Sequence, residues 1–324
     1  MNQEQKTELE KIISRDYGNI AGMVIQRDDE VLYENYFNDC SAATAIHVFS
    51  ITKSIVSILF GIAIDKGYIK GVDQKVLEFF PNYIMKRGEK TIQTVMIEHM
   101  LTMTAPYKYR SAPYTKYFTS DDWVKSALDL LGGKKPVGEF RYTPLIGPDI
   151  LSGILANASG QSMLDFAREH LFSPLGITVE NAITFKDKEE QFAFLKAKGI
   201  SGWVADPQGT NTAGWGLTMT AMDMAKIGKL CLDGGKWQDK QIVSAGWIAE
   251  SLKEYSRWEE LKLPYGYLWW SKIGNGYAAM GDSGNVIYVN PNKKLVVSIA
   301  SLFQPTAKDR VTFIMEHIEP ILET

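Results

Sequence analysis

The sequence is poor in cysteine and histidine. Its 324 residues contain two cysteines, Cys40 and Cys231, which lie far apart and have no metal-ligand spacing. A disulfide between them stays open as an alternative, although two single small hydrophobic residues are the simpler interpretation. The four histidines are scattered without the spacing of a metal site, so we expect neither a metal nor another cofactor.

The sequence also lacks an excess of one charge and a long apolar run. Lys and Arg number 35 and Asp and Glu 38, for a formal net charge of −3, and no long run of like charge indicates a nucleic-acid partner. The longest apolar stretch, residues 55–64, is broken by Ser57 and is about half as long as a membrane span. Residues 1–14 are polar and acidic, unlike a secretory signal. We therefore expect a cytoplasmic protein without a membrane span.

The composition, with 45% hydrophobic and 23% charged residues, is typical of a globular chain that can form one large core or two smaller ones. Strand-like runs near both ends and helical periodicity in the middle predict one antiparallel sheet built from the two termini, with a helical region inserted. The expected strands are residues 20–26, 30–36, 265–271, 277–280, 285–289 and 295–301. The expected helices include residues 4–14, 120–131, 146–158, 163–171, 220–232, 244–255 and 308–322.

Ser50 and Lys53 are the first candidates for chemistry. Ser50 lies where a strand-like and turn-like region gives way to a very apolar helix that ends at Gly67. Residues three apart share a helix face, so the Lys53 amine can approach the Ser50 hydroxyl, and a desolvated lysine can activate a serine. The helix N-terminus also directs N–H groups at developing negative charge. Because one such pair is expected by chance in a chain of this composition, the pair alone does not establish a nucleophile.

Further segments place this pair in a wider pattern. Residues 49–54 (Phe-Ser-Ile-Thr-Lys-Ser) resemble the nucleophile motif of the serine β-lactamase and penicillin-binding-protein superfamily. That superfamily is characterised by Ser-x-x-Lys, a Tyr-x-Asn or Ser-x-Asn element and a late Lys/His-x-Gly element. Residues 66–81, 91–104, 214–228 and 265–270 are similar to segments of the branch that contains class C β-lactamases, esterases and related amide hydrolases. The similarity runs in the expected order from about residue 20 to residue 305.

The resemblance implies an α+β fold of the β-lactamase/transpeptidase type. In this fold a five-stranded antiparallel sheet is flanked by the terminal helices, and a helical lobe is inserted. We expect residues 1–66 and 238–324 to form the sheet lobe and residues 67–237 the helical lobe of one bilobal unit. The active site would lie between the lobes, with Ser50 at the N-terminus of the central helix.

The resemblance assigns the second element to residues 140–147, where Tyr142 matches a family tyrosine that shares in proton transfer. A nearby ammonium would lower the pKa of its phenol, which is ordinarily about 10. A buried tyrosine with a satisfied hydroxyl is the alternative. Pro144 replaces the family asparagine, and because proline has no side-chain amide, we expect contacts to the lysine and to a substrate amide to be lost.

The third element falls at residues 279–285. Gly284 matches the family glycine, so the backbone N–H groups of Ser50 and Asn285 are expected to form the oxyanion hole. Asp282 occupies the position of a cationic residue or histidine, where its charge would repel a substrate carboxylate; a solvated turn residue is the alternative. Tyr107 and Trp203 lie in regions that either rim the pocket or cover the core. The candidate substrate-binding residues are therefore Tyr107, Pro144, Trp203, Asp282, Ser283 and Gly284.

These residues predict a metal-independent serine hydrolase that forms an acyl-enzyme on Ser50. Its substrate would be a small-molecule ester, amide or peptide, and activity on β-lactams would be weak or absent. Lys53 and Tyr142 would share the proton transfer, and the sequence does not decide which is the principal base. One alternative is a true β-lactamase or D-alanyl carboxypeptidase. Another is a catalytically degenerate binding or sensing module on the same fold.

Overall fold

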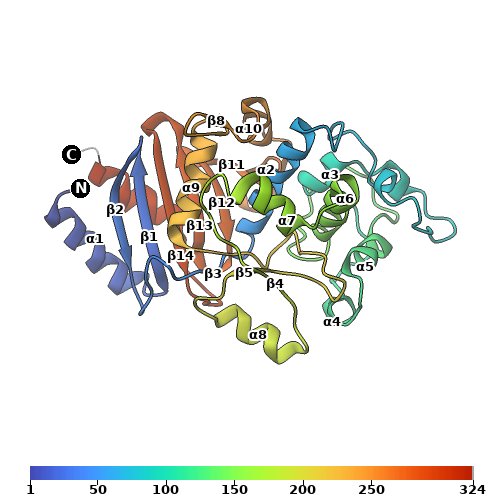
Figure 1. The fold of residues 1–324 in the computed structure, drawn as a ribbon, viewed down its shortest axis with the longest axis horizontal. Helices are drawn as coiled ribbons and strands as arrows, with labels where there is room; N and C mark the ends of the chain where they lie inside the picture. The colour runs from blue at the N-terminus through green and yellow to red at the C-terminus, as the bar shows by residue number, and fades with distance from the viewer. Residues whose placement is uncertain (323–324) are drawn as a thin grey trace.

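Within residues 1–322, which the computed structural model describes, an antiparallel sheet of eight strands forms one side of the molecule (Figure 1). The expected mixed fold of helices and strands is confirmed. The expected number of five strands is wrong, because the described residues form eight in the order β2-β1-β14-β13-β12-β11-β10-β9. The strands are β1 (Ile20–Arg27), β2 (Glu30–Tyr36), β9 (Ser256–Trp258), β10 (Leu263–Tyr265), β11 (Trp270–Ile273), β12 (Gly276–Gly281), β13 (Asn285–Asn290) and β14 (Leu295–Ser301).

A tight turn accounts for part of this difference. The stretch 265–271, which the sequence predicts as one strand, folds back on itself between β10 and β11. The Gly266 N–H donates to the Trp269 carbonyl at 2.8 Å, and Leu268 has a positive φ of 60°. A Cβ at position 266 would lie 2.1 Å from the carbonyl oxygen of Ser251, so only glycine fits there. Because the aromatic residues around this turn are all buried, the hydrophobic pattern does not reveal it.

Helices cover both faces of the sheet (Figure 1). α1 (Gln3–Asp16) lies on one face beside the C-terminal helical segment, and the ring centroids of Tyr17 and Phe313 are 4.3 Å apart. On the other face, α9 (Ala221–Leu232) packs on β1, β13 and β14. The C-terminal segment consists of α11 (Arg310–Phe313), the π-helical η7 (Ile314–Ile318) and η8 (Pro320–Leu322). The sheet is thus held between terminal helices and an internal helix.

Short helices and long loops form the other side of the molecule (Figure 1). The helices here are α3 (Ile97–Leu101), α4 (Tyr114–Phe118), α5 (Trp123–Leu130), α6 (Asp149–Ser159), α7 (Met163–Ala167) and α8 (Lys188–Lys196). Small strand pairs join β3 (Ile46–His47) to β6 (Thr218–Met219), β4 (Asn181–Ile183) to β5 (Gly202–Val204) and β7 (Lys236–Trp237) to β8 (Lys240–Gln241). Since α9 packs on the sheet, we propose that the helical lobe ends before α9 and not at residue 237.

α2 (Ile51–Asp65) runs between the sheet and the helical lobe. Its residues 51–63 are buried, and it packs against β12 and β13 on one side and against α6 on another. Burial on every side explains its almost continuous apolar sequence. α2 thereby brings the residue before its first turn, Ser50, to the junction of the two lobes. Although α2 is strongly apolar, no helix within residues 1–322 is both long and apolar enough to cross a membrane.

Candidate active site

Ser50 lies in a constrained turn immediately before α2. The Val48 N–H donates to the Leu217 carbonyl at 3.0 Å, which places this turn beside the segment that precedes β6. Phe49 has a φ of 51°, a strained value for a residue with a side chain, and its carbonyl accepts a hydrogen bond from the Thr52 hydroxyl at 2.7 Å. The Ser50 hydroxyl does not cap the helix and is partly exposed. It is therefore available to other groups at the junction of the lobes.

Lys53 lies one turn further along α2 and is almost completely buried, with 1% of its surface exposed. Its Nζ atom is 2.9 Å from Ser50 Oγ, 2.8 Å from the carbonyl oxygen of Pro144 and 2.6 Å from that of Gly214. A neutral amine has two N–H groups and one lone pair. The two carbonyls can hold both N–H groups, which leaves the lone pair directed at the Ser50 hydroxyl.

Burial lowers the pKa of Lys53 to about 7, because the charged form loses its hydration. The negative charges of Asp282 and Asp149 oppose this effect and raise the pKa. Near neutral pH a large fraction of Lys53 is therefore neutral. A neutral amine 2.9 Å from a hydroxyl oxygen has the geometry and the basicity of a general base.

Tyr142 lies on another side of Lys53, whose Nζ is 5.2 Å from the centroid of the phenol ring. Trp258 stacks on the ring with 5.7 Å between centroids. Burial raises the pKa of the phenol to about 12, against the smaller opposing effect of a hydrogen bond with Ser50. The expectation that a nearby ammonium lowers this pKa is wrong, because desolvation has the larger effect. Tyr142 stays protonated at neutral pH, and its hydroxyl can donate a hydrogen bond.

Pro144 contacts the lysine through its backbone and not through the side-chain amide whose loss the sequence predicts. Its carbonyl oxygen accepts a hydrogen bond from Lys53 Nζ, so the backbone replaces the missing side-chain amide on the lysine side. Gly214, which sequence reasoning did not single out, supplies the second carbonyl. A Cβ at position 214 would lie 2.6 Å from the Pro144 oxygen, so the two carbonyls converge on Lys53 only because this residue is glycine. The signal in the sequence is the segment 214–228, which begins with this glycine and is similar to a family segment.

Asn285 does not have the free N–H that the sequence predicts for it. The residues of η5 (Asp282–Gly284) form a 3-10 turn in which the Asn285 N–H donates to the Asp282 carbonyl. The Asn285 side chain is buried, and its oxygen accepts from the Ser301 N–H at 2.9 Å. A Cβ on Gly284 would lie 2.8 Å from Nε of Arg310, so Gly284 faces the C-terminal segment. The assignment of Gly284 and Asn285 to the oxyanion hole is therefore wrong.

Gly281 lies next to Ser50 instead. A Cβ at this last position of β12 would be 2.3 Å from the Val48 carbonyl oxygen and 3.2 Å from the Ser50 nitrogen. The next N–H along the chain, that of Asp282, opens the 3-10 turn and has no partner within it, since the first N–H groups of a helical turn are unbonded. In the structure it is therefore Gly281, and not Gly284, that lies next to Ser50. Two glycines three positions apart make both alignments possible in the sequence.

The other candidate residues fall into two groups. Asp282 is exposed, and its charge raises the pKa of both Lys53 and Tyr142, so it lies close to the reacting groups. The hydroxyl of Ser283 is held by the backbone of a neighbouring loop at Gln304. Tyr107 and Trp203 are 6% and 0% exposed, and the Trp203 indole N–H donates to a buried carbonyl at 2.7 Å. Both aromatic residues contribute to the core and have little or no surface for a substrate.

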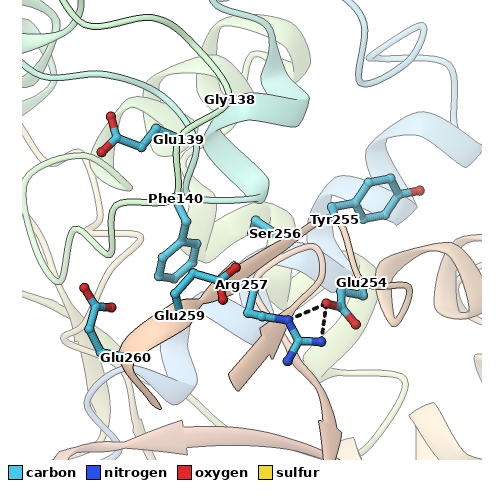
Figure 2. Close-up of a pocket in the computed structure, with 9 residues that line it drawn as sticks. All are labelled: Gly138, Glu139, Phe140, Glu254, Tyr255, Ser256, Arg257, Glu259 and Glu260. Carbon is cyan, nitrogen blue, oxygen red and sulfur yellow. Dashed lines mark hydrogen bonds and ion pairs between the residues drawn. The ribbon is translucent and has the colours of Figure 1, made fainter. Parts of the chain in front are cut away.

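A cavity of about 650 Å³ lies beside Phe140 and Arg257 (Figure 2). It is lined by Gly138, Glu139, Phe140, Glu254, Tyr255, Ser256, Arg257, Glu259 and Glu260. The Phe140 ring centroid is 6.2 Å from that of Trp258, the residue that stacks on Tyr142. Figure 2 shows Arg257 paired with Glu254, which leaves the walls acidic, because they carry four glutamates and one arginine.

Known proteins resemble this chain in sequence and in fold. The model of a family described as Beta-lactamase matches residues 9–314. The chain is 22% identical over 312 residues to a 6-aminohexanoate-dimer hydrolase of Paenarthrobacter ureafaciens, over 88% of this chain and 73% of that protein. A family VIII carboxylesterase has a TM-score of 0.73 at 14% identity, over 98% of this chain and 96% of the other. A penicillin-binding protein homologue from Caulobacter crescentus has a TM-score of 0.70 at 16% identity, over 93% and 91%.

Proposed function

The chain belongs to the β-lactamase family, in the superfamily of serine β-lactamases and penicillin-binding-protein-like enzymes, and from this premise we propose that it hydrolyses carboxylic esters or small amides through an acyl-enzyme on Ser50. Membership of the family indicates a hydrolase. The substrate class and the roles of single residues are the further step. The geometry around Lys53 supports this step, as do relatives named a dimer hydrolase and a carboxylesterase.

The observation that carries the proposal is the position of Lys53 Nζ between Ser50 Oγ and two backbone carbonyls. In the first step Lys53 accepts the Ser50 proton while Oγ attacks the substrate carbonyl carbon. The bond to the leaving group then breaks, and the proton passes through the Tyr142 hydroxyl to the leaving oxygen or nitrogen. Water attacks the acyl-enzyme in the second step, and its proton returns to Ser50 Oγ.

Lys53 is the principal base in this scheme, and Tyr142 is the proton donor. The pKa of Lys53 is lowered to about 7, so the amine can accept a proton near neutral pH. The pKa of Tyr142 is raised to about 12, so its phenol retains a proton to donate. Two neighbouring groups whose environments move their pKa values apart suit the two roles.

The backbone N–H groups of Ser50 and Asp282 form the oxyanion hole in this proposal. Gly281 brings the β12 edge against the Ser50 segment, and the N–H that follows it is unpaired within its turn. Two preorganised donors of this kind stabilise the charge that develops on the carbonyl oxygen. Because both are backbone groups, the acidic side chain of Asp282 does not prevent its N–H from acting.

The charges around the site favour neutral or cationic substrates. The exposed carboxylate of Asp282 and the acidic cavity beside Phe140 both disfavour a substrate that carries a carboxylate, as β-lactam antibiotics do. Pro144 also lacks the side-chain amide that would bind a substrate amide. These features support an ester as the preferred substrate, followed by a small amide.

The test compares release of p-nitrophenol from p-nitrophenyl butyrate by the wild type, Ser50→Ala and Ser57→Ala. Ser57 lies on the same helix, and its buried hydroxyl has no hydrogen-bond partner within residues 1–322. We expect Ser50→Ala to lose at least about 10³-fold in kcat/KM and Ser57→Ala to keep the wild-type rate. A chromogenic cephalosporin is measured in parallel.

Each outcome of this test is informative. Ester turnover that depends on Ser50, with little cephalosporin turnover, supports the proposal. Cephalosporin turnover that exceeds ester turnover would contradict the substrate class and favour a β-lactamase. A wild type that cleaves neither compound and forms no adduct on Ser50 with a fluorophosphonate would contradict the enzymatic function and favour a binding module.

A further inference from the structure

Asp149 is a buried carboxylate to which the proposed mechanism assigns no role. It is the first residue of α6 and is 2% exposed. Its Oδ2 accepts a hydrogen bond from the Tyr117 hydroxyl at 2.5 Å, and its Oδ1 accepts one from the Ala213 N–H at 2.7 Å. The Gly214 N–H is a further donor to this carboxylate. The side chain therefore ties three segments of the helical lobe together.

The Gly214 peptide links Asp149 to the candidate base. On one side of this residue the N–H donates to Asp149, and on the other the carbonyl accepts from Lys53 Nζ at 2.6 Å. A displacement of the Ala213–Gly214 backbone would displace the carbonyl that holds Lys53. The position of Lys53 thus depends on a carboxylate that does not touch it.

A purely structural function does not require a carboxylate here. The start of a helix favours a negative charge, but the side-chain hydrogen bonds of Asp149 go to other segments and not to the first turn of α6. Burial raises the pKa of Asp149 to about 7, which shows that the ionised form is costly, while its hydrogen bonds and Lys53 oppose this shift. An asparagine has a similar shape and would avoid this cost.

We propose that Asp149 is a positioning residue for Lys53, which fixes the Gly214 carbonyl and sets the basicity of the amine through its negative charge. This inference rests on the proposed function of Lys53 as the base. The charge of Asp149 raises the pKa of the buried Lys53, which helps the amine to remain basic enough to accept the serine proton. Tyr117 supports it by donating to the same carboxylate.

Other polar and charged groups also act on Lys53 and Asp149. On the Lys53 side they are Asp282, whose charge raises its pKa, and the phenol of Tyr142. On the Asp149 side they are the Tyr117 hydroxyl and, beyond it, the buried Asp206, whose charge acts on Tyr117. Of the two charges that raise the pKa of Lys53, that of Asp282 has the larger effect, and that of Asp149 is the buried one.

The experiment measures how fast a fluorophosphonate modifies Ser50, by intact mass, from pH 5 to pH 10. The proteins are the wild type, Asp149→Asn, Tyr117→Phe and the control Ser57→Ala. Loss of the negative charge in Asp149→Asn lowers the pKa of Lys53, so the acid limb of the rate should move to lower pH. The shift should be less than about one unit, because a carboxyl with a pKa of about 7 is itself partly protonated there. A less basic amine is a weaker base, so the plateau should fall about threefold.

Tyr117→Phe keeps the carboxylate but removes a hydrogen bond that favours its ionised form. Its acid limb should move in the same direction by about half a unit, which provides a test if Asp149→Asn does not fold. Limbs that stay at the wild-type pH in both variants would overturn the inference even if the rates fall, since that is the result of a merely structural role. A wild type whose Ser50 is not modified at any pH would overturn the proposed function itself, and the inference with it.

Discussion

Ser50 is surrounded by different chemical groups on its two sides. On the sheet side, Gly281 lies against the backbone of Val48 and Ser50, and the N–H of the next residue, Asp282, is the proposed oxyanion donor. On the side of the helical lobe, the Tyr142 side chain and the carbonyls of Pro144 and Gly214 surround Lys53. In the proposed mechanism the sheet side therefore acts through the shape of the backbone, and the lobe side through groups that hold and move a proton.

This difference indicates which substitutions each side tolerates. A regular strand with fixed register positions its N–H groups whatever side chains it carries, provided that the close approach at Gly281 stays open. The lobe side depends on irregular loops that burial and hydrogen bonds hold in place. Substitutions on the sheet side should therefore lower activity by steric clash. Substitutions on the lobe side should lower it by removing groups that bind or transfer a proton.

Lys53→Met, on the lobe side, should cause the largest loss of activity. The substitution removes the base and leaves the Ser50 hydroxyl without an acceptor for its proton, so kcat/KM should fall by about 10⁴-fold. In the wild type, Lys53 is protonated as pH falls below about 7, so the rate should decline on the acid side of that pH. Initial rates with p-nitrophenyl butyrate from pH 5 to pH 9 check both points. A Lys53→Met variant with more than a tenth of the wild-type rate would rule out the lysine as the base.

Gly281→Ala, on the sheet side, should lower activity because the added Cβ has no room. The added Cβ would meet the Val48 carbonyl at 2.3 Å and displace the edge of β12 from Ser50, with a loss of about 10²- to 10³-fold in kcat as the oxyanion donor moves. Gly284→Ala is the matched control. It meets Arg310 at a φ of 86°, so it should cost about 1 kcal/mol of folding free energy and leave the ester rate nearly unchanged. If Gly284→Ala lowered the ester rate more than Gly281→Ala does, the oxyanion donor would be the N–H that follows Gly284.

Tyr142→Phe should reduce activity less and in a way that depends on the leaving group. With an alkyl ester, whose alkoxide needs a proton to depart, kcat should fall by about 10²-fold. With a p-nitrophenyl ester, whose phenolate leaves without protonation, the loss should be clearly smaller. Pairs of butyrate esters measured on the same protein provide the comparison. Equal losses for both esters would indicate that Tyr142 does not donate the proton.

Asp282→Asn should have the smallest effect, because it keeps the backbone N–H and changes only an exposed charge. For a neutral ester we expect a change of less than about tenfold in kcat/KM. The pKa of Lys53 should fall, since Asp282 raises it, so the acid limb should move to lower pH, in the same direction as in Asp149→Asn. An ester that carries a carboxylate should gain in kcat/KM. A loss for that ester would contradict the proposed repulsion.

Much of the fold and the centre of the site could be predicted from the sequence. Runs of β-branched, aliphatic and aromatic residues reveal β1, β2, β13 and β14, because these residue types favour strands wherever they lie in a sheet. The spacing of Ser50 and Lys53 is equally local, since one helix sets their geometry. The length of a helix such as α9 (Ala221–Leu232) follows from its apolar periodicity and its Thr220 cap.

Other features depend on contacts that no local pattern contains. Gly266 forms a turn because the Ser251 carbonyl lies against it, and this contact is invisible in an aromatic run. Gly281 and Gly284 are equivalent in sequence and differ only in what packs on them. The hydrogen bond between Asp149 and Ala213 joins residues 64 positions apart, so only the folded chain shows it.

Asn285 has a consequence for the dynamics of the site. Its side-chain nitrogen donates to the Asp282 carbonyl at 2.8 Å, while its side-chain oxygen accepts from the Ser301 N–H on β14 at 2.9 Å. The turn that carries the Asp282 N–H is thereby fastened to the interior of the sheet. Its conformational entropy is lost once, when the chain folds, and not again at each turnover. The same residue that cannot serve as an oxyanion donor thus keeps the proposed donor still while charge develops on the substrate.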